Sequence, residues 1–535
     1  MDTLALVTAI RIEAAEPSLQ DNTADLDRLK AVLSQALPAN IAGRSLSLPF
    51  GCMATVADAF RNACFKGYAV LNVLPRQLHI IDFLPHKPEI LPGIALDLGT
   101  THLEATLVDL LTGTTLAHGH AVNRQIEYGT DILSRIHFAV KKKGEDQDRN
   151  GLQVIQQAIL TTINDLVEEL TGQAETTADN VRAIAISGNT TMVHLLSGLS
   201  PYHICREPYI PLFNDPDPFL SREIGLNLHP QALVWILPSI GSYFGGDLIS
   251  GILSVGLDRA EQISMFIDVG TNAEVVLGNQ EWLIACAGAA GPALEGGVAR
   301  MGMRADAGAV EHVTIDRSSW QLNWQAIDDV PPVGICGSGL IDLVAELYLA
   351  RIVDLRGKFQ AEFTAQTEQQ KTFVHKRLVT LDGETVFIVA FAEESGNNEP
   401  VVLSQIDLDA MMRSKAAMYA ILTTLTAQVG VEFAELDRIY VAGAFGEHID
   451  PRQAITLGML PDLPFSTYEP VGNSSLHGAE LILLDEAARL RAREIGRKIT
   501  YIELNVNQEF MIRFSGSRFI PHTDPKIFPS VPVFS

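Results

Sequence analysis

Two short segments of this 535-residue chain repeat the same order of residue types, and this repeat constrains the fold more than any other feature. Residues 95–101 read ALDLGTT and residues 266–272 read FIDVGTN. In each copy an apolar run contains an acidic residue. Gly and side chains that donate hydrogen bonds follow it, and a second apolar run comes next. This order predicts a strand–turn–strand unit. A repeat spaced by about 170 residues is too long for a solenoid, so it indicates two α/β lobes with the active cleft between them.

The remaining pattern alternates apolar strand segments with amphipathic helices. Strands are predicted at 93–98 and 183–187, and a core-facing helix is predicted at 152–170. Asp407 is expected to cap a helix at 408–429, which Gly430 would end. Three prolines between residues 85 and 92 separate the first part of the chain from the rest. The predicted domains are a small N-terminal linker or middle domain at 1–91, a first α/β lobe at 92–260, a second α/β lobe at 261–499 and a C-terminal extension at 500–535.

Composition argues against binding to nucleic acid, insertion into a membrane and secretion. Lys and Arg number 39 and Asp and Glu number 64, a net charge of −25, which disfavours binding to nucleic acid or to an anionic membrane. The longest apolar runs, such as 386–391, are far shorter than the roughly 18–20 residues of a membrane-spanning helix. The first residues lack the basic start and long apolar core of a secretion signal. Five cysteines without a CxxC pair favour a reducing, cytoplasmic setting.

The first repeated turn has the residue types of a phosphate site. Gly99 allows close approach of the backbone to an anion, and Thr100 and Thr101 supply hydrogen-bond donors. Asp97, at the end of a buried strand, needs a partner for its charge. Mg²⁺ is a suitable partner, because it prefers a carboxylate together with phosphate and water oxygens. A tight β-turn without a ligand is the alternative interpretation.

The second turn repeats this chemistry with Asp268, Gly270, Thr271 and Asn272. If the two turns face one another, they clamp a polyphosphate and its metal ion. Asp97 and Asp268 are therefore the predicted metal ligands and members of the catalytic set.

Three further segments are candidates for the same site. Small residues at 441–446 would let a flat nucleoside lie on the backbone, and the glycine-rich turn at 334–339 leads into a helix, whose N-terminus attracts anions. Asp247 follows two glycines, and either Asp247 or Asp97 is predicted to orient the attacking water. Packing turns, and a capping role for Asp247, are the alternatives. The predicted nucleotide-binding residues in these segments are Gly337, Ser338, Gly339, Gly443, Ala444, Phe445 and Gly446.

Together these motifs resemble the acetate and sugar kinase/Hsp70/actin (ASKHA) superfamily. A narrower resemblance, to the reductive activators of corrinoid proteins, covers almost the whole chain. It is carried by long stretches in the right order, among them GIALDLGTTHLEATLVDLLTG (93–113), SGNTTMVHLLSG (187–198), FIDVGTNAEVVLG (266–278), GICGSGLIDLVAELY (334–348) and VAGAFGEHIDPRQAITLGMLP (441–461). The resemblance implies an α/β fold, a two-lobed actin/Hsp70-like ATPase with duplicated ribonuclease-H-like lobes and a small N-terminal α+β domain.

The resemblance also implies an ATP-hydrolysing enzyme, a homodimer that binds ATP and Mg²⁺ and acts on a corrinoid protein of a methyltransferase system. It helps return Co(II) to Co(I). Family members usually carry an iron–sulfur unit, which needs four thiolates at close spacing. Cys52 and Cys64 are twelve residues apart with no third cysteine near them, so no iron–sulfur cluster is expected in this chain. The chain is expected to start where a ferredoxin domain would end, and a separate ferredoxin-like protein would supply the electron.

Two alternative functions remain open. One is an ATPase chaperone or binding partner of a corrinoid protein without a redox role. The other is a small-molecule kinase of the same superfamily, although no sugar or acetate recognition segment stands out in the sequence.

Overall fold

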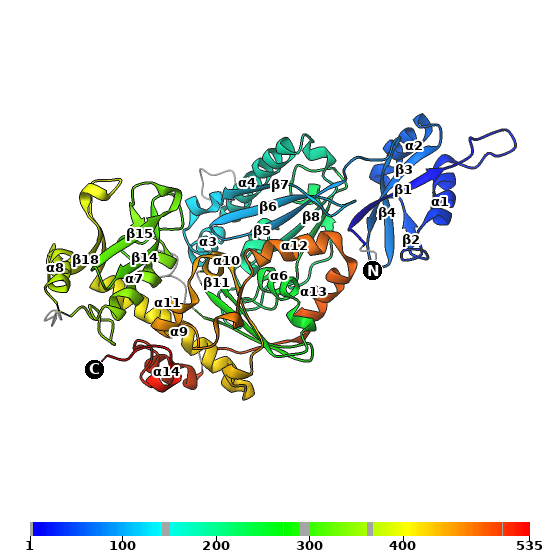
Figure 1. The fold of residues 1–535 in the computed structure, drawn as a ribbon. Coiled ribbons are helices and arrows are strands. Elements are labelled where there is room, and N and C mark those ends of the chain that lie inside the picture. The colour runs from blue at the N-terminus through cyan, green and yellow to red at the C-terminus, as the bar shows by residue number, and fades with distance from the viewer. Residues whose placement is uncertain are drawn as a thin grey trace. The chain divides into compact units, whose positions relative to one another are not determined.

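The structure is a computed structural model that describes residues 4–141, 150–270, 272–288, 299–360, 367–504 and 507–534 (Figure 1). The chain forms two compact units. Unit 1 comprises residues 1–254 and 474–497, and unit 2 comprises residues 255–473 and 498–535. No helix among the described residues is both long enough and apolar enough to cross a membrane.

The N-terminal part of unit 1 is a small α+β domain with its own apolar core, as expected. Its sheet has the strand order β1-β3-β4-β2 and is accompanied by two helices. Helix α1 (Asp25–Ala36) buries Leu29 and Leu33 on one face, and it ends where Leu37 adopts an extended conformation before Pro38. The elements are β1 (Val7–Glu13), β2 (Ser45–Ser47), β3 (Lys66–Val73), β4 (Gln77–Leu84), α1 and α2 (Met53–Asn62).

The larger sheet of unit 1 has the strand order β7-β6-β5-β8-β10-β9. β5, β6 and β7 form an antiparallel meander, and β8 and β10 continue the sheet parallel to β5. Helix α4 (Gly151–Gln173) packs on β7 and buries the apolar face that the sequence predicted. The strands are β5 (Pro92–Leu98), β6 (His102–Asp109), β7 (Thr115–Val122), β8 (Ala183–Gly188), β9 (Phe219–Leu220) and β10 (Leu233–Ile236).

Two helices that follow unit 2 along the chain return to unit 1. Helix α12 (Ser474–Leu484) packs on β5 and β8, and α13 (Glu486–Lys498) follows it (both orange in Figure 1). A Cβ atom on Gly478 of α12 would lie only 2.4 Å from Cβ of Ser250 in α6 (Gly246–Val255). Glycine therefore permits the close contact of these helices. The predicted domain boundaries stay predictions, although residues 474–497 pack in unit 1 and not with the rest of the predicted second lobe.

Five strands of the main sheet of unit 2 repeat the topology of the large sheet of unit 1, which confirms the duplicated two-lobed fold class; the sixth strands, β9 and β22, lie at opposite edges. Its strand order is β21-β20-β11-β12-β13-β22. β11, β12 and β13 form an antiparallel meander, and β20 and β21 extend the sheet in parallel from β11. The strands are β11 (Ser264–Val269), β12 (Ala273–Gly278), β13 (Leu283–Gly288), β20 (Ile439–Ala442), β21 (Tyr468–Pro470) and β22 (Ile499–Tyr501).

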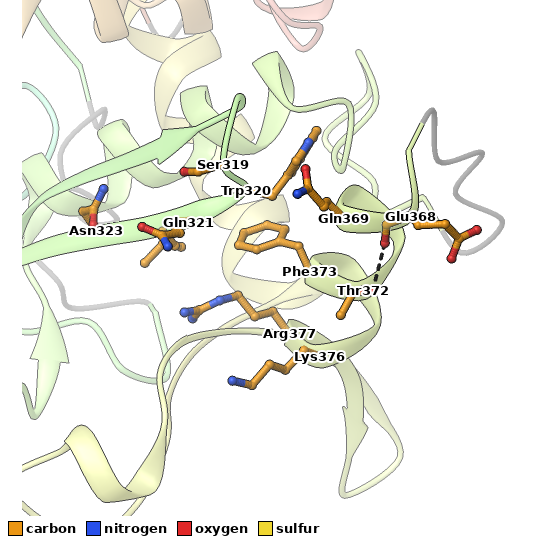
Figure 2. A pocket seen from close by; sticks show the side chains of 11 residues that line it. Ser319, Trp320, Gln321, Asn323, Glu368, Gln369, Thr372, Phe373, Lys376 and Arg377 are labelled. Atoms are coloured by element: carbon orange, nitrogen blue, oxygen red, sulfur yellow. Dashed lines mark hydrogen bonds between the residues drawn. The ribbon is translucent and has the colours of Figure 1, made fainter.

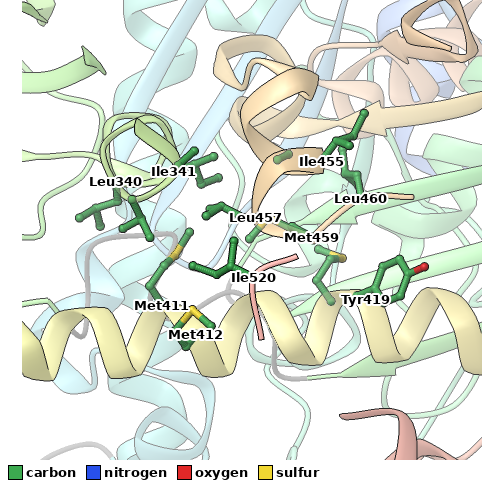
Figure 3. Close-up of a cluster of buried hydrophobic side chains, with 14 of the residues drawn as sticks. Leu340, Ile341, Met411, Met412, Tyr419, Ile455, Leu457, Met459, Leu460 and Ile520 are labelled. Carbon is green, nitrogen blue, oxygen red and sulfur yellow. The ribbon is translucent and has the colours of Figure 1, made fainter. Parts of the chain in front are cut away.

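Unit 2 also holds two three-stranded sheets, β15-β14-β16 and β17-β18-β19, and the long helix α9 (Gln405–Val429). Met411 and Met412 of α9 pack with Leu340, Ile341 and Ile520 in the core (Figure 3). The added strands are β14 (Ala309–Asp316), β15 (Gln321–Ala326), β16 (Gly334–Ile335), β17 (Leu378–Leu381), β18 (Glu384–Ala390) and β19 (Val401–Ser404).

The start of α9 corrects one prediction. Ser404, and not Asp407, is the N-cap residue, and Asp407 occupies the third helical position of a capping box. The Ser404 hydroxyl accepts from the Asp407 N–H at 3.2 Å, and the Asp407 carboxylate accepts from the Ser404 N–H at 3.0 Å. The predicted end is confirmed, because Gly430 has the left-handed conformation, with φ of 68°.

Candidate functional site

The first repeated turn joins β5 to β6, as predicted, and is held by a buried asparagine. A Cβ atom on Gly99 would lie 2.3 Å from the His102 carbonyl oxygen, so the turn admits only glycine there. The Asn123 side chain donates to the Gly99 carbonyl at 3.0 Å, and the Asn123 N–H donates to the Thr101 carbonyl at 2.8 Å. Asn123 is fully buried and was not among the predicted site residues. Its role follows from the β6–β7 register, which the sequence does not reveal.

Asp97, at the end of β5, is connected to a chain of three serine hydroxyls. The Ser475 hydroxyl donates to the Asp97 carboxylate at 2.7 Å and lies 2.8 Å from the Ser187 hydroxyl. Ser187 is in turn 2.8 Å from the Ser250 hydroxyl. The three serines come from α12, β8 and α6, and all three are buried. Asp97 therefore has one oriented carboxylate oxygen at the edge of a half-buried site.

Asn189 connects the first turn to the end of β8. Its side-chain amide donates to the Thr100 hydroxyl at 3.1 Å, and its side-chain oxygen caps helix α5 (Thr190–Leu196) by accepting from the Met192 N–H at 3.0 Å. Thr100 is therefore fixed by a residue that follows the neighbouring parallel strand. The sequence pattern did not single out Asn189, although the position of Gly188-Asn189-Thr190 between a predicted strand and a helix was a signal that could have identified it.

Asp247, in the first turn of α6, lies against this junction. A Cβ atom on Gly245 would be 2.3 Å from Cα of Asn189 and 2.6 Å from an oxygen of the Asp247 carboxylate. Burial raises the pKa of the Asp247 carboxyl to about 6, and a hydrogen bond from the Leu248 N–H partly opposes this shift. The structure thus brings Asp97, Thr100, Asn189 and Asp247 to the carboxyl ends of the parallel strands β5, β8 and β10, where open α/β sheets bind ligands. A carboxyl with this pKa is suited to proton transfer near neutral pH.

The second repeated turn joins β11 to β12, also as predicted. The Gly270 N–H donates to the Asn272 carbonyl at 2.9 Å, and Thr271 lies outside the described residues. Asp268 pairs in register with Ala442 of β20, so it lies beside the start of the 441–446 motif. A Cβ atom on Gly443 would lie 3.5 Å from the Asp268 carboxylate. The structure therefore brings the second acidic residue together with the predicted nucleoside segment.

The 441–446 motif is not only a turn. Its last four residues belong to the short helix α10 (Gly443–His448), which begins directly after β20. Gly443 has φ of 72°, and a Cβ atom on Gly446 would lie 2.1 Å from the Val441 carbonyl oxygen. Both glycines are thus required by the sharp change from strand to helix. Ala444 and Phe445 lie within α10.

A packing role is evident for the 337–339 segment, which begins helix α7 (Gly337–Leu349). A Cβ atom on Gly339 would lie 2.1 Å from the Val310 carbonyl oxygen of β14. The Ser338 hydroxyl donates to the Glu311 carbonyl at 3.0 Å. The glycine therefore allows α7 to contact β14 closely, and the predicted nucleotide contact of Gly337, Ser338 and Gly339 stays a prediction.

Both repeated hairpins place a glutamate opposite the aspartate, which sequence reasoning did not single out. Asp97 is in register with Glu104, and Asp268 is in register with Glu274. Side chains directly opposite in an antiparallel pair lie on the same face, where like charges are destabilising. The Glu104 carboxylate also contacts the His118 ring at 2.8 Å. The same Asp–Glu register pair therefore occurs in both units.

The described residues contain no group of three or more His, Cys, Asp or Glu side chains that could hold a metal ion. A Mg²⁺ ion at either aspartate would therefore depend on phosphate and water oxygens for its other ligands, which is its usual mode of binding. The five cysteines are free thiols in different parts of the chain, and burial raises the pKa of the Cys52 thiol to about 11. The absence of an iron–sulfur cluster stays a prediction.

Three family models together match almost the whole chain. Residues 2–89 match the RACo linker region, residues 92–260 match the RACo middle region, and residues 262–532 match the C-terminal domain of RACo, the ASKHA domain. This chain belongs to the RACo family. The predicted family and the ASKHA-type fold of the C-terminal half are thereby confirmed.

Individual RACo-like proteins agree with this assignment. The chain is 31% identical over 448 residues to the corrinoid activation enzyme RamQ of Eubacterium limosum, covering 83% of this chain and 73% of RamQ. It is 24% identical over 437 residues to a [Co(II) methylated amine-specific corrinoid protein] reductase of Methanosarcina barkeri, covering 76% and 73%. The solved structure of a reductive activator for corrinoid, iron–sulfur protein has a TM-score of 0.86 and 36% identity, covering 99% of this chain and 81% of that one.

Proposed function

We propose that this chain is an ATP-dependent reductive activator of a corrinoid protein in a methyltransferase system. It would act as a homodimer and help a bound Co(II) corrinoid take up one electron to become Co(I). Membership of the RACo family supports this proposal, and so do the names of two relatives, a corrinoid activation enzyme and a Co(II) corrinoid protein reductase. Five cysteines without a CxxC pair favour a separate iron–sulfur protein as the electron donor.

The duplicated hairpin is the observation that carries the ATP part of the proposal. In unit 1 the carboxyl ends of three parallel strands collect an acidic side chain, hydroxyl groups and a carboxyl with a pKa of about 6. In unit 2 the acidic residue adjoins a strand–helix junction of small residues. Carboxylate, hydroxyl and backbone N–H groups are the chemistry that Mg²⁺ and phosphate require.

Each predicted residue has a specific role in this proposal. Thr100 and Thr101, with Thr271 and Asn272, would donate to phosphate oxygens, and Gly270, whose N–H donates to the Asn272 carbonyl, would let the backbone approach them closely. Asp97 and Asp268 would hold Mg²⁺, which neutralises charge on the phosphates when bound. Asp247 would orient the attacking water and accept its proton, since its carboxyl is in part deprotonated near neutral pH. The 443–446 and 337–339 segments would contact the nucleoside.

ATP is required because reduction of Co(II) to Co(I) is uphill for ordinary cellular donors. Binding of ATP would change the affinity of the activator for its corrinoid partner, and hydrolysis to ADP and phosphate would release that partner. Such coupling needs a different affinity in the two nucleotide states, typically by about 1–3 kcal/mol. The electron itself comes from the separate donor, so the reaction balances without a redox group in this chain.

The test is the absorption spectrum of a purified corrinoid protein mixed with a low-potential reductant, the full chain and ATP. We expect the Co(I) band only when both the chain and ATP are present. Asp97→Asn and Asp268→Asn should abolish the band and the release of phosphate. Asp58→Asn, at an exposed position of α2, is the matched control and should behave as the unchanged protein.

Other outcomes would replace the proposal. ATP-dependent binding of the corrinoid protein without the Co(I) band would identify a partner without a redox role. A phosphorylated small-molecule product would identify a kinase. Calorimetry with a non-hydrolysable ATP analogue gives an independent check, and absence of binding would remove the nucleotide assignment.

A further inference from the structure

A groove of about 580 Å³ lies in unit 2, between strand β15 and helix α8 (Glu368–Arg377), and its lining residues include none from the repeated hairpins (Figure 2). One wall consists of five consecutive residues, 319–323, at the start of β15. The other wall is one face of α8, because its lining residues fall at positions 368, 369, 372, 373, 376 and 377. A strand and a helix thus flank the groove.

β15 is an edge strand. Among the described residues it pairs only with β14, which in turn pairs with β16 on its other side. Its side chains alternate, with Gln321 and Asn323 exposed and Leu322 half-buried against the core. An edge strand presents backbone N–H and C=O groups to a further strand. The wall of the groove is therefore a surface on which an extended polypeptide can pair.

The floor of the groove is aromatic. The Trp320 and Phe373 rings are 5.7 Å apart at one end, and Phe373 is buried. Figure 2 shows Phe373 between the strand and the helix, with Arg377 and Lys376 beside it. Such a floor accommodates apolar side chains that alternate along an extended segment.

Two cations stand at the C-terminal end of α8. The Arg377 guanidinium donates to the Ile388 and Val389 carbonyls at 2.8 and 2.9 Å and lies 4.8 Å from the Phe391 ring. The Lys376 ammonium lies 4.6 Å from the same ring, and its side chain is exposed. Glu394 offsets part of the Arg377 charge, so the exposed Lys376 is the main cation at this end, and Glu368 lines the opposite end of the groove.

We propose that this groove binds an extended, acidic segment of another protein, which adds as a strand to β15 and places a carboxylate against Lys376 and Arg377. A peptide fits better than a small molecule, because one wall of the groove is an edge strand, the usual site of strand addition. The positive charges of Lys376 and Arg377 favour a peptide with an acidic side chain at this position. The proposal does not depend on nucleotide binding.

The test uses two pools of fluorescent peptides of about eight residues. In the acidic pool, Val alternates with either Thr or Glu along each peptide. In the basic pool, Lys replaces every Glu. With the full-length chain, we expect the acidic pool to bind about tenfold or more tightly than the basic pool. The Lys376→Glu variant should bind the acidic pool about tenfold more weakly than the unchanged chain does. Lys371→Glu is the matched control, since Lys371 is exposed on α8 and does not line the groove.

Strand addition has its own signature. Methylation of the peptide nitrogens along one edge should abolish binding, whereas methylation along the other edge should not. Amide hydrogen exchange at residues 321–326 should slow when the unmethylated peptide binds. The proposal is overturned if the acidic pool does not bind at about 1 mM, if Lys376→Glu has no effect, or if exchange in β15 is unchanged.

Discussion

The Ser475 hydroxyl donates a 2.7 Å hydrogen bond to the Asp97 carboxylate, although 378 residues separate the two along the chain. The same hydroxyl lies 2.8 Å from Ser187, so one side chain of α12 contacts the ends of both β5 and β8. Ser475 is buried, so its hydroxyl forms its hydrogen bonds within the protein.

Ser475→Ala should therefore affect both the fold and the proposed reaction. Loss of a buried hydrogen bond costs about 1 kcal/mol of unfolding free energy, and the Asp97 carboxylate loses the donor that orients it. We expect a lower urea midpoint and slower ATP hydrolysis. The control is Ser34→Ala, because the exposed Ser34 hydroxyl donates only to the Ala31 carbonyl within its own helix. Equal hydrolysis rates in the two variants would contradict the role given to Ser475.

Gly443 and Gly430 provide a matched pair for the second half of the site. Both have left-handed backbones, with φ of 72° and 68°, so alanine at either position should cost about 1 kcal/mol of stability. Only at Gly443 would the new methyl group face the Asp268 carboxylate, since nothing lies within 4 Å of a Cβ atom at Gly430. We expect both variants to unfold at similarly lowered urea concentrations. Nucleotide affinity measured by calorimetry should fall only in Gly443→Ala, and equal affinities would refute the assignment of this junction.

Asp247 should make stability depend on pH. Its folded pKa of about 6 exceeds the unfolded value of about 3.9, so the folded state binds this proton more strongly. The stabilisation is complete below about pH 4 and is lost as the pH rises through 6. The Asn side chain of Asp247→Asn is neutral at every pH. The unfolding free energy of this variant should therefore equal that of the unchanged protein near pH 4 and exceed it by at most about 3 kcal/mol at pH 8.

Urea unfolding at several pH values measures this difference. The exposed Asp58→Asn is the control and should show a constant difference. A flat difference for Asp247→Asn as well would show that its carboxyl is not perturbed by burial. Under the proposed mechanism the more stable Asp247→Asn variant should also be inactive in ATP hydrolysis, which a purely structural aspartate would not require.

Lys415 should anchor the C-terminal segment of unit 2. It is fully buried in α9, and its ammonium donates to the Phe519 and Pro521 carbonyls at 2.6 and 2.7 Å. Lys415→Met leaves both carbonyls without this donor, so amide exchange in residues 517–534 should accelerate while exchange in the α9 interior changes less. Lys371→Met, at an exposed position, should leave exchange in this segment unchanged.

The same lysine gives a second pH signature. Burial lowers the pKa of the Lys415 amine well below its usual range, so the unfolded chain binds this proton more strongly than the folded one. Its contribution to stability therefore rises with pH until the unfolded value of about 10.4. The unfolding free energies of the unchanged protein and of Lys415→Met should be measured at neutral pH and at about pH 10. The rise should be present in the unchanged protein and missing from the variant. A difference that does not vary with pH would contradict the shifted pKa.

Local sequence patterns were sufficient to predict the hairpins and most core elements. The apolar runs before Asp97 and Asp268 are buried strands, and the helical spacing of apolar residues at 152–170 is the buried face of α4. The cap of α9 was assigned to the wrong residue because Ser404 and Asp407 share a reciprocal capping box, and either side chain alone satisfies the usual pattern.

Relationships across the fold could not be predicted in this way. The contacts of Ser475 with Asp97 and Ser187 depend on the return of α12 to unit 1, and no local preference of residues 474–484 encodes that return. The opposition of Glu104 to Asp97 and of Glu274 to Asp268 depends on strand register, because the two turns differ in length by one residue. The predicted grip of one nucleotide by both hairpins stays a prediction.

The return of residues 474–497 also sets an order of events during synthesis. Domains generally fold as units while the ribosome extends the chain from the N-terminus, but the sheet of unit 1 receives α12 only after all of residues 255–473 have been made. Until then β5 and β8 lack the helix that covers them, and Asp97 lacks its serine donor. A nascent chain halted before residue 474 should therefore expose apolar strand surface and favour chaperone binding, even with its first 254 residues fully translated.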